Sequence, residues 1–168
     1  SEEEISKIVN TPNWFKKLVS KKSITKNIEY YNNYYKEYNW IDDKMEKELD
    51  ITELIHRGGV LKNVEGFSTK DIYHNIIQMI DLPDCMDREQ VYNALCAREE
   101  ILSTAVGNGI ALPHARAPIM KDENDQRICV AYLKQPINMN APDERFVHVM
   151  FVLLTQNPQD HLKVLSTL

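Results

Sequence analysis

The chain has 168 residues, 43% of them hydrophobic, and carries a formal net charge of -5 at pH 7. This length is enough to bury the core of one medium-sized domain. No apolar run approaches the roughly 18 to 20 residues of a membrane-spanning helix, and the N-terminus lacks the charged-then-apolar pattern of a signal peptide. We therefore expect a soluble cytoplasmic protein without membrane insertion, and its net charge gives no overall attraction to nucleic acid or anionic membranes.

The cysteines, Cys85, Cys96 and Cys129, form neither a CxxC pair nor a metal-finger spacing. We expect reduced, mostly structural thiols. Because His and Cys ligands are not clustered, we expect no catalytic metal and no bound cofactor.

Residues 1–49 differ in composition from the rest of the chain. Six lysines and no acidic residue occur between Ile5 and Ile28, whereas the remainder is net acidic. The apolar positions from Ile5 to Val9, and a Thr-Pro start at 11 and 12, predict two short helices. The tyrosine-rich stretch 28–41 predicts a small hairpin, and 42–49 a connecting helix.

Two interpretations of this extension stay open. The paired short helices resemble a small helix-turn-helix module of the excisionase or MerR-like kind, which would let residues 1–49 bind DNA. Alternatively, they form a lysine-decorated helical extension that packs on the following domain or pairs two protomers. The acidic triplet Glu2 to Glu4 weakens the case for DNA.

Residues 50–168 predict helices that alternate with strands. Ser68 and Asp87 are each expected to cap a helix, the first running through IYHNIIQMI and the second through REQVYNALCAREE. Strands are expected at 109–112, 128–133 and 146–154, the last two as buried strands, and a final helix at 158–168. His148 falls in the last strand, where we expect a core histidine. This alternation predicts an α/β fold.

The segment REEILSTAVGNGIALPHARAP, which begins at Arg98, holds the strongest candidate for chemistry. It places His114 between Arg98 and Arg116, behind a Gly-Asn-Gly turn at 107–109 that tolerates positive φ. Pro113 stops any helix, so the imidazole of His114 is expected to be presented at a strand end. The pattern indicates a site for a negatively charged group.

Phosphoryl chemistry suits these residue types. A neutral imidazole is a good nucleophile near pH 7, and arginine forms bidentate bonds to phosphate that lysine cannot copy. His161 follows a predicted cap at Asn157 and Pro158, so it lies in the first turn of the last helix, where free N–H groups favour an anion. Taken singly, each of these residues is more often a solvated or structural group.

These motifs together resemble the type 2 IIA phosphocarrier domains of the sugar phosphotransferase system (PTS), which include the fructose, mannitol and nitrogen-regulatory IIA domains. The resemblance rests on the sequence segments GNGIALPHAR, LIHRGGVLKNVEG, the RE pair at 98 and 99, FVHVMFVLL and NPQDHLKVL. The resemblance implies an α/β/α sandwich with a mixed sheet flanked by helices over 50–168, preceded by the small, mainly helical segment 1–49. The family domain continues beyond the helix that ends at Leu168, so it also implies a C-terminally incomplete domain.

The resemblance assigns roles to matching positions. His114 would accept the phosphoryl group, His161 would be the second active-site histidine, and Arg98 would contact the phosphate. Ser103 and Thr104 match an ST pair that would bind phosphate or contact a partner, although both residues also suit the start of a turn. Arg116 would contact the phosphate or a docking partner.

Three functions stay open at this point. The first is a regulatory phosphohistidine carrier like the nitrogen-regulatory IIA proteins, phosphorylated by HPr or its nitrogen-branch counterpart and read by partner proteins. The second is the IIA component of a fructose- or mannitol-type uptake system that passes phosphate to a IIB cysteine. The third is a DNA- or partner-binding regulator without phosphotransfer. The basic extension favours the first.

Overall fold

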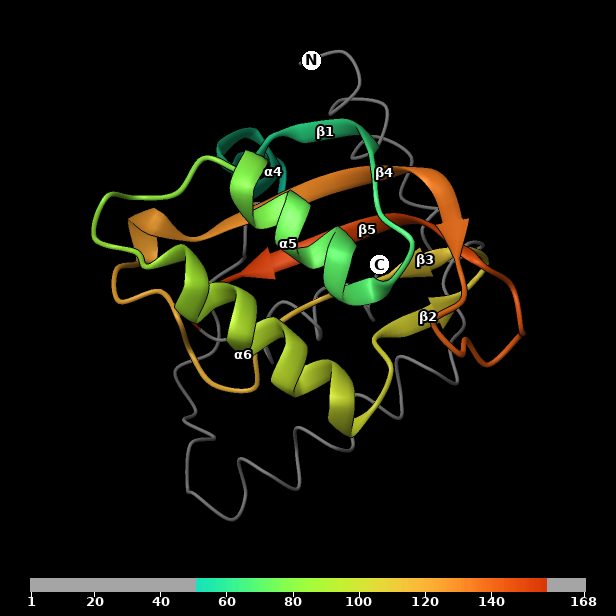
Figure 1. Ribbon diagram of the computed structural model, residues 1–168. Coiled ribbons are helices and arrows are strands. Elements are labelled where there is room, and N and C mark those ends of the chain that lie inside the picture. The colour runs from blue at the N-terminus through green and yellow to red at the C-terminus, as the bar shows by residue number, and fades with distance from the viewer. Residues whose placement is uncertain (1–50, 157–168) are drawn as a thin grey trace.

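Five strands form one mixed sheet in the computed structural model, which describes residues 51–156. In chain order the strands are β1 (Val60–Val64), β2 (Ala105–Gly107), β3 (Ile110–Ala111), β4 (Arg127–Ile137) and β5 (Val147–Leu154). Their order across the sheet is β1-β4-β5-β3-β2 (Figure 1). β1 pairs with β4 and β3 with β5 in parallel, whereas β4 with β5 and β2 with β3 are antiparallel. The mixed sheet that the resemblance implied is confirmed.

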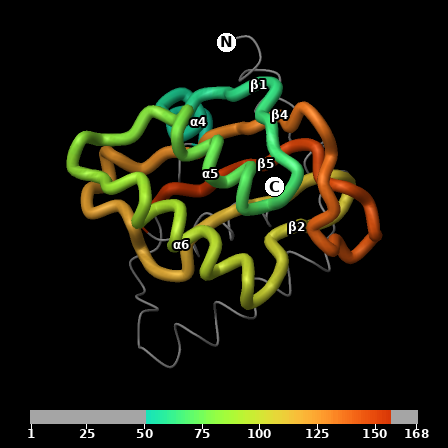
Figure 2. Tube along the Cα trace, in the orientation of Figure 1, coloured from blue at the N-terminus to red at the C-terminus, as the bar shows by residue number. Residues whose placement is uncertain are grey.

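Helices flank this sheet. They are α4 (Ile51–Gly58), α5 (Thr69–Met79) and α6 (Arg88–Ile101), and a short 3-10 turn, η1 (Glu123–Asp125), precedes β4. α5 and α6 lie side by side in front of the sheet, whereas α4 lies behind its β1–β4 edge (Figures 1 and 2). The main apolar core joins α5 and α6 to the sheet, with Ile72 and Leu95 packed in the same cluster as Val152. The α/β class predicted from the sequence is therefore correct.

Both predicted helix starts are confirmed. The Ser68 hydroxyl accepts the Asp71 N–H at 3.1 Å, and the Asp87 carboxylate accepts the N–H groups of Glu89 and Gln90 at 2.9 and 3.4 Å. Each cap satisfies N–H groups that the first turn of a helix leaves without an intrahelical partner, a contribution of about 1 kcal/mol.

The predicted buried strands are also found. β4 is buried over its first five residues, and β5 is buried except at His148. Cys129 on β4 lies fully inside, where burial raises the pKa of its thiol to about 12, and all three cysteines are free. The expectation of mostly structural thiols therefore fits Cys129 best, since Cys85 is exposed and Cys96 half-buried.

The expected core position of His148 is wrong, because its side chain is exposed. The N–H groups of His148 and Val149 both donate to the Gly109 carbonyl, at 2.8 and 3.2 Å. Burial alternates at this start of β5, where Val147 and Val149 are buried on either side of the exposed His148. The His148 ring lies against Gly109, at the rim of the sheet.

The Gly-Asn-Gly segment forms the tight turn between β2 and β3. Its φ angles are 101° at Gly107, 54° at Asn108 and 81° at Gly109, as the sequence predicted. An Asn-Gly pair with positive φ matches the twist of a two-stranded hairpin. The Asn108 N–H donates to the Asp143 carboxylate at 2.6 Å, which ties the turn to the loop before β5.

The predictions for residues 1–49 and for the helix 158–168 lie outside the described residues and stay predictions. The same holds for the proposed boundary near residue 50.

Candidate functional site

His114 lies just past β3, where the chain still runs beside β5. The Leu153 N–H donates to the Pro113 carbonyl over 2.8 Å, and His114 forms an isolated parallel bridge with Leu153. The position at a strand end agrees with the sequence prediction. The side chain is only 1% exposed, so the imidazole at this strand end is buried.

A backbone carbonyl fixes the tautomer of this imidazole. The Nδ1 atom of His114 lies 2.6 Å from the Leu112 carbonyl oxygen. Because a carbonyl oxygen can only accept, Nδ1 carries the proton and donates it, and the lone pair belongs to Nε2. Nε2 is therefore the nucleophilic nitrogen of the ring.

The imidazole is neutral over the physiological pH range. Burial, and then the positive charge of Arg98, lower the pKa of His114 from 6.5 to about 3, against the opposing effect of the Leu112 hydrogen bond. Desolvation disfavours the charged form, and a nearby cation does the same for an imidazole. A neutral ring retains the lone pair that attack on phosphorus requires.

Arg98 lies near His114 and is itself buried. It stands in the last turn of α6 with 0% exposure, and its Nη1 atom donates to the carbonyl of Leu102, the residue that ends the helix, at 2.5 Å. Buried arginines are rare, because removing a guanidinium from water is costly. An anion that arrives beside this group gains a strong, charge-assisted partner. The structure thus brings together two of the three residues to which the resemblance assigns a catalytic role.

Ser103 and Thr104 both hydrogen bond within the fold. The Ser103 hydroxyl donates to the Met139 carbonyl at 2.5 Å and accepts the Ala105 N–H at 3.1 Å. The Thr104 hydroxyl donates to the Glu99 carboxylate at 2.7 Å. Both residues therefore serve the entry into β2, and a phosphate contact by either hydroxyl would have to replace these bonds.

The remaining candidates are Arg116 and His161. Arg116 is exposed, two residues beyond His114. His161 lies outside the described residues, so its distance from the other candidates is not defined.

Two residues that were not candidate site residues, Glu99 and Thr155, lie next to residues of the site. Glu99 accepts hydrogen bonds from Thr104 and from a buried tyrosine, Tyr73. Thr155 comes directly after β5, two residues beyond Leu153, and alternate residues along an extended strand lie on the same face of the sheet. Leu153 is bridged to His114, so Thr155 and His114 lie on the same face. Its buried hydroxyl has no hydrogen-bond partner in the described part of the chain. The only sequence signal for Thr155 is a hydroxyl at the end of an apolar run.

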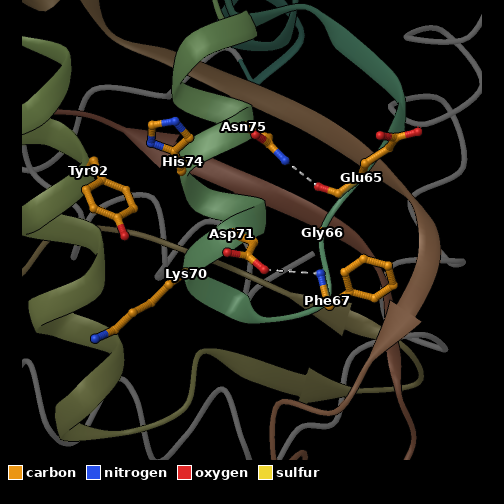
Figure 3. A pocket seen from close by; sticks show the side chains of 8 residues that line it. All are labelled: Glu65, Gly66, Phe67, Lys70, Asp71, His74, Asn75 and Tyr92. Carbon is orange, nitrogen blue, oxygen red and sulfur yellow. Dashed lines mark hydrogen bonds between the residues drawn. The ribbon is translucent and has the colours of Figure 1, made fainter.

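A separate cavity of about 380 Å³ opens between α5, α6 and the loop after β1 (Figure 3). It is lined by Glu65, Gly66, Phe67, Lys70, Asp71, His74, Asn75 and Tyr92, none of which was a candidate site residue. The ring of His74 meets that of Tyr92 edge to face, with centroids 5.8 Å apart. His74 thus packs against an aromatic neighbour.

The range 51–156 contains no group of three or more His, Cys, Asp or Glu side chains that could hold a metal ion. It also contains no helix that is both long and apolar enough to cross a bilayer.

Fold and site together define a class of protein: an α/β domain that sets a neutral imidazole beside a buried guanidinium, suited to an anionic group. Residues 53–168 match the family described as "Phosphoenolpyruvate-dependent sugar phosphotransferase system, EIIA 2". The chain belongs to this EIIA type 2 family.

Individual relatives agree with this assignment. The nitrogen regulatory protein of Pseudomonas aeruginosa is 32% identical over 121 residues, which cover 70% of this chain and 76% of that protein. The 2-O-alpha-mannosyl-D-glycerate-specific EIIABC component of Escherichia coli K12 is 25% identical over 144 residues, but these cover only 21% of its length. The solved structure of the nitrogen regulatory protein IIA-Ntr from Neisseria meningitidis has 31% identity and a TM-score of 0.54, over 65% of this chain and 73% of that one.

Proposed function

We propose that this protein is a phosphohistidine carrier with a regulatory role, and that His114 is the residue that accepts the phosphoryl group. The observation that carries the proposal is the state of its ring: Nδ1 donates to the Leu112 carbonyl, and the lone pair of Nε2 belongs to a neutral imidazole beside Arg98. Membership of the EIIA type 2 family supports the same chemistry.

The transfer step balances with the groups that are present. Nε2 of His114 attacks the phosphorus of a phosphohistidine on the donor, a new N–P bond forms, and the donor's N–P bond breaks and returns its electron pair to the donor's imidazole. The proton on Nδ1 stays in place, so the attacked ring becomes an imidazolium whose positive charge is shared by its two nitrogens. Arg98 stabilises the phosphoryl oxygens, since oriented cations at the position of developing charge are the main means of accelerating phosphoryl transfer.

Burial imposes a further requirement. A ring that is 1% exposed cannot meet a phosphate on another protein. Docking of the donor must therefore uncover Nε2 before transfer. By the family resemblance, HPr or its nitrogen-branch counterpart is the donor, His161 completes the active site, and the location is the cytoplasm, where these donors occur.

The regulatory role is favoured over sugar uptake by the relatives. The nitrogen regulatory proteins are the more similar relatives, with 32% identity in P. aeruginosa and 28% in Haemophilus influenzae. The sugar-specific EIIABC components of Escherichia coli and Bacillus subtilis are each 25% identical over the residues that match. Transfer to a IIB cysteine is the second candidate function, and regulation by DNA or partner binding without phosphotransfer is the third.

Phosphorylation in vitro tests the proposal. The full chain is incubated with phosphoenolpyruvate, enzyme I and either donor, and its intact mass is measured for the wild type, His114→Ala and His161→Ala. We expect one phosphoryl group on the wild type and none on His114→Ala. An unmodified wild type overturns the carrier function, and a phosphorylated His114→Ala overturns the site. Adding a IIB domain then separates the two carrier roles: rapid loss of the phosphoryl group to its cysteine favours sugar uptake.

A further inference from the structure

The carboxylate of Glu99 connects the two parts of the site, the Arg98 guanidinium and the segment that leads to His114. Glu99 follows Arg98 in the last turn of α6, and both of its oxygens are used. One accepts the Thr104 N–H at 3.0 Å, and the other accepts the hydroxyls of Thr104 and Tyr73 at 2.7 and 2.8 Å. Hydrogen bonds to an ionised carboxylate are roughly twice as strong as neutral ones. Thr104 is therefore held at both its backbone and its side chain.

Thr104 in turn holds the strand that carries His114. Its carbonyl accepts the Leu112 N–H at 3.0 Å, and the Leu112 carbonyl accepts Nδ1–H of His114 at 2.6 Å. A continuous path of hydrogen bonds thus runs from the Glu99 carboxylate through Thr104 and Leu112 to the acceptor ring.

The hydrogen bonds between Glu99 and Thr104, together called the clamp below, also affect the Arg98 guanidinium. Arg98 donates to the carbonyl of Leu102, at the end of the helix and two residues before Thr104. Because Glu99 bonds Thr104 to the end of α6, it holds the short loop from Leu102 to Thr104 in place, and with it the Leu102 carbonyl to which Arg98 donates. The positions of Arg98 and His114 therefore both depend on Thr104.

We propose that Glu99 is a positioning residue for phosphoryl transfer: through Thr104 it fixes the position of the His114 ring relative to the Arg98 guanidinium. This inference rests on the phosphocarrier function proposed above. Reacting groups that shift by about 1 Å lose on the order of 10²-fold in rate, so loss of the clamp slows transfer even where the fold survives.

The test compares two substitutions that each disturb the Glu99 cluster. Glu99→Gln keeps the shape of the side chain but replaces one carboxylate oxygen by an NH₂ group, which cannot accept a hydrogen bond, so either the Thr104 N–H or the two hydroxyls lose their acceptor. Tyr73→Phe removes a buried hydroxyl that donates to the same carboxylate at 2.8 Å and lies 3.4 Å from the Thr104 hydroxyl, yet it leaves both bonds between Glu99 and Thr104 and the path from Thr104 to His114 in place. Tyr73→Phe is therefore the matched control for loss of stability alone.

Two readouts are taken on the full chain. In rapid-mixing assays with phosphorylated donor, we expect Glu99→Gln to lower the maximal rate by roughly tenfold or more with an unchanged donor concentration for half-maximal rate, and Tyr73→Phe to retain the wild-type rate. In ¹⁵N imidazole spectra of the free protein, we expect the Nδ1–H signal of His114 to shift or broaden in Glu99→Gln only. Should Glu99→Gln not fold, Thr104→Val, which removes only the hydroxyl from the clamp, takes its place in the spectra.

The outcomes are distinct. A Glu99→Gln variant with the wild-type maximal rate and an unchanged His114 spectrum overturns the proposal, as does an equal rate loss in both variants. A wild type that accepts no phosphate overturns the carrier function instead, and the imidazole spectra then decide by themselves whether Glu99 positions His114.

Discussion

Acid destabilises this protein through His114, because the imidazole is neutral in the fold and becomes charged when the chain unfolds. Burial and the Arg98 charge lower its pKa from 6.5 to about 3. Between these two values the unfolded chain binds a proton that the folded chain excludes. The contribution to stability is therefore fully present above pH 6.5 and is lost progressively as the pH falls toward 3.

The size of this loss follows from the pKa shift. One pKa unit corresponds to about 1.4 kcal/mol, so the free energy of unfolding falls by about that amount for each pH unit below 6.5. At about pH 5 the loss caused by His114 alone is roughly 2 kcal/mol. Domains are stable by only about 5 to 15 kcal/mol, so the effect is measurable.

Urea denaturation near neutral pH and near pH 5 measures it. His114→Gln is the control, because glutamine does not titrate while the carboxylates of the chain titrate in both proteins. We expect the wild type to lose roughly 2 kcal/mol more than His114→Gln between the two conditions. Equal losses in the two proteins would contradict a buried neutral imidazole.

Four further substitutions have defined outcomes. Arg98→Met removes a charge that lowers the pKa of the His114 imidazole, so we expect a smaller acid-induced loss of stability in urea titrations. We also expect the rate of phosphorylation to fall by about 10²-fold. Normal kinetics would remove Arg98 from the site. Thr155→Val replaces a buried hydroxyl that has no partner among residues 51–156, so we expect a gain of about 1 kcal/mol in thermal unfolding, whereas a lower Tm would show that the hydroxyl is bonded. Gly58→Ala would put a Cβ 2.0 Å from the Ile128 carbonyl oxygen, whereas at Gly59, with a φ of 78°, nothing lies within 4 Å of the added Cβ. We expect the free energy of unfolding to fall by about 3 kcal/mol for Gly58→Ala and by about 1 kcal/mol for Gly59→Ala. Equal losses would refute the close approach of α4 to β4.

Local signals carried the successful parts of the fold prediction. Ser68 and Asp87 cap their helices with bonds that reach two or three residues along the chain, which a sequence displays directly. The long apolar runs of β4 and β5 announce buried strands in the same way. By contrast, β2 and β3 have three and two residues, too few to show a period, and the sequence reading missed β2 altogether. Neither α4 nor β1 was predicted, since each is short and β1 is largely exposed.

The sequence predicted which residues form the candidate site but not the burial and protonation state of the His114 ring. The motif around His114 identified the acceptor candidate and Arg98, whereas burial of the ring depends on packing that spacing does not reveal. The role we propose for Glu99 depends on Tyr73, 26 residues earlier, and on the entry into β2. His148 shows the converse error: its place in an apolar run indicated a core position, whereas the structure exposes its side chain at the start of β5, where its N–H donates to the Gly109 carbonyl.

The nitrogen that carries the phosphoryl group tests the central claim most directly. The chain is labelled with ¹⁵N-histidine, phosphorylated by phosphoenolpyruvate, enzyme I and the donor, and observed by ¹⁵N and ³¹P NMR. Because Nδ1 of His114 donates to the Leu112 carbonyl, we expect a single phosphohistidine, at Nε2 of His114. Phosphate on Nδ1, or on another histidine, would contradict the account.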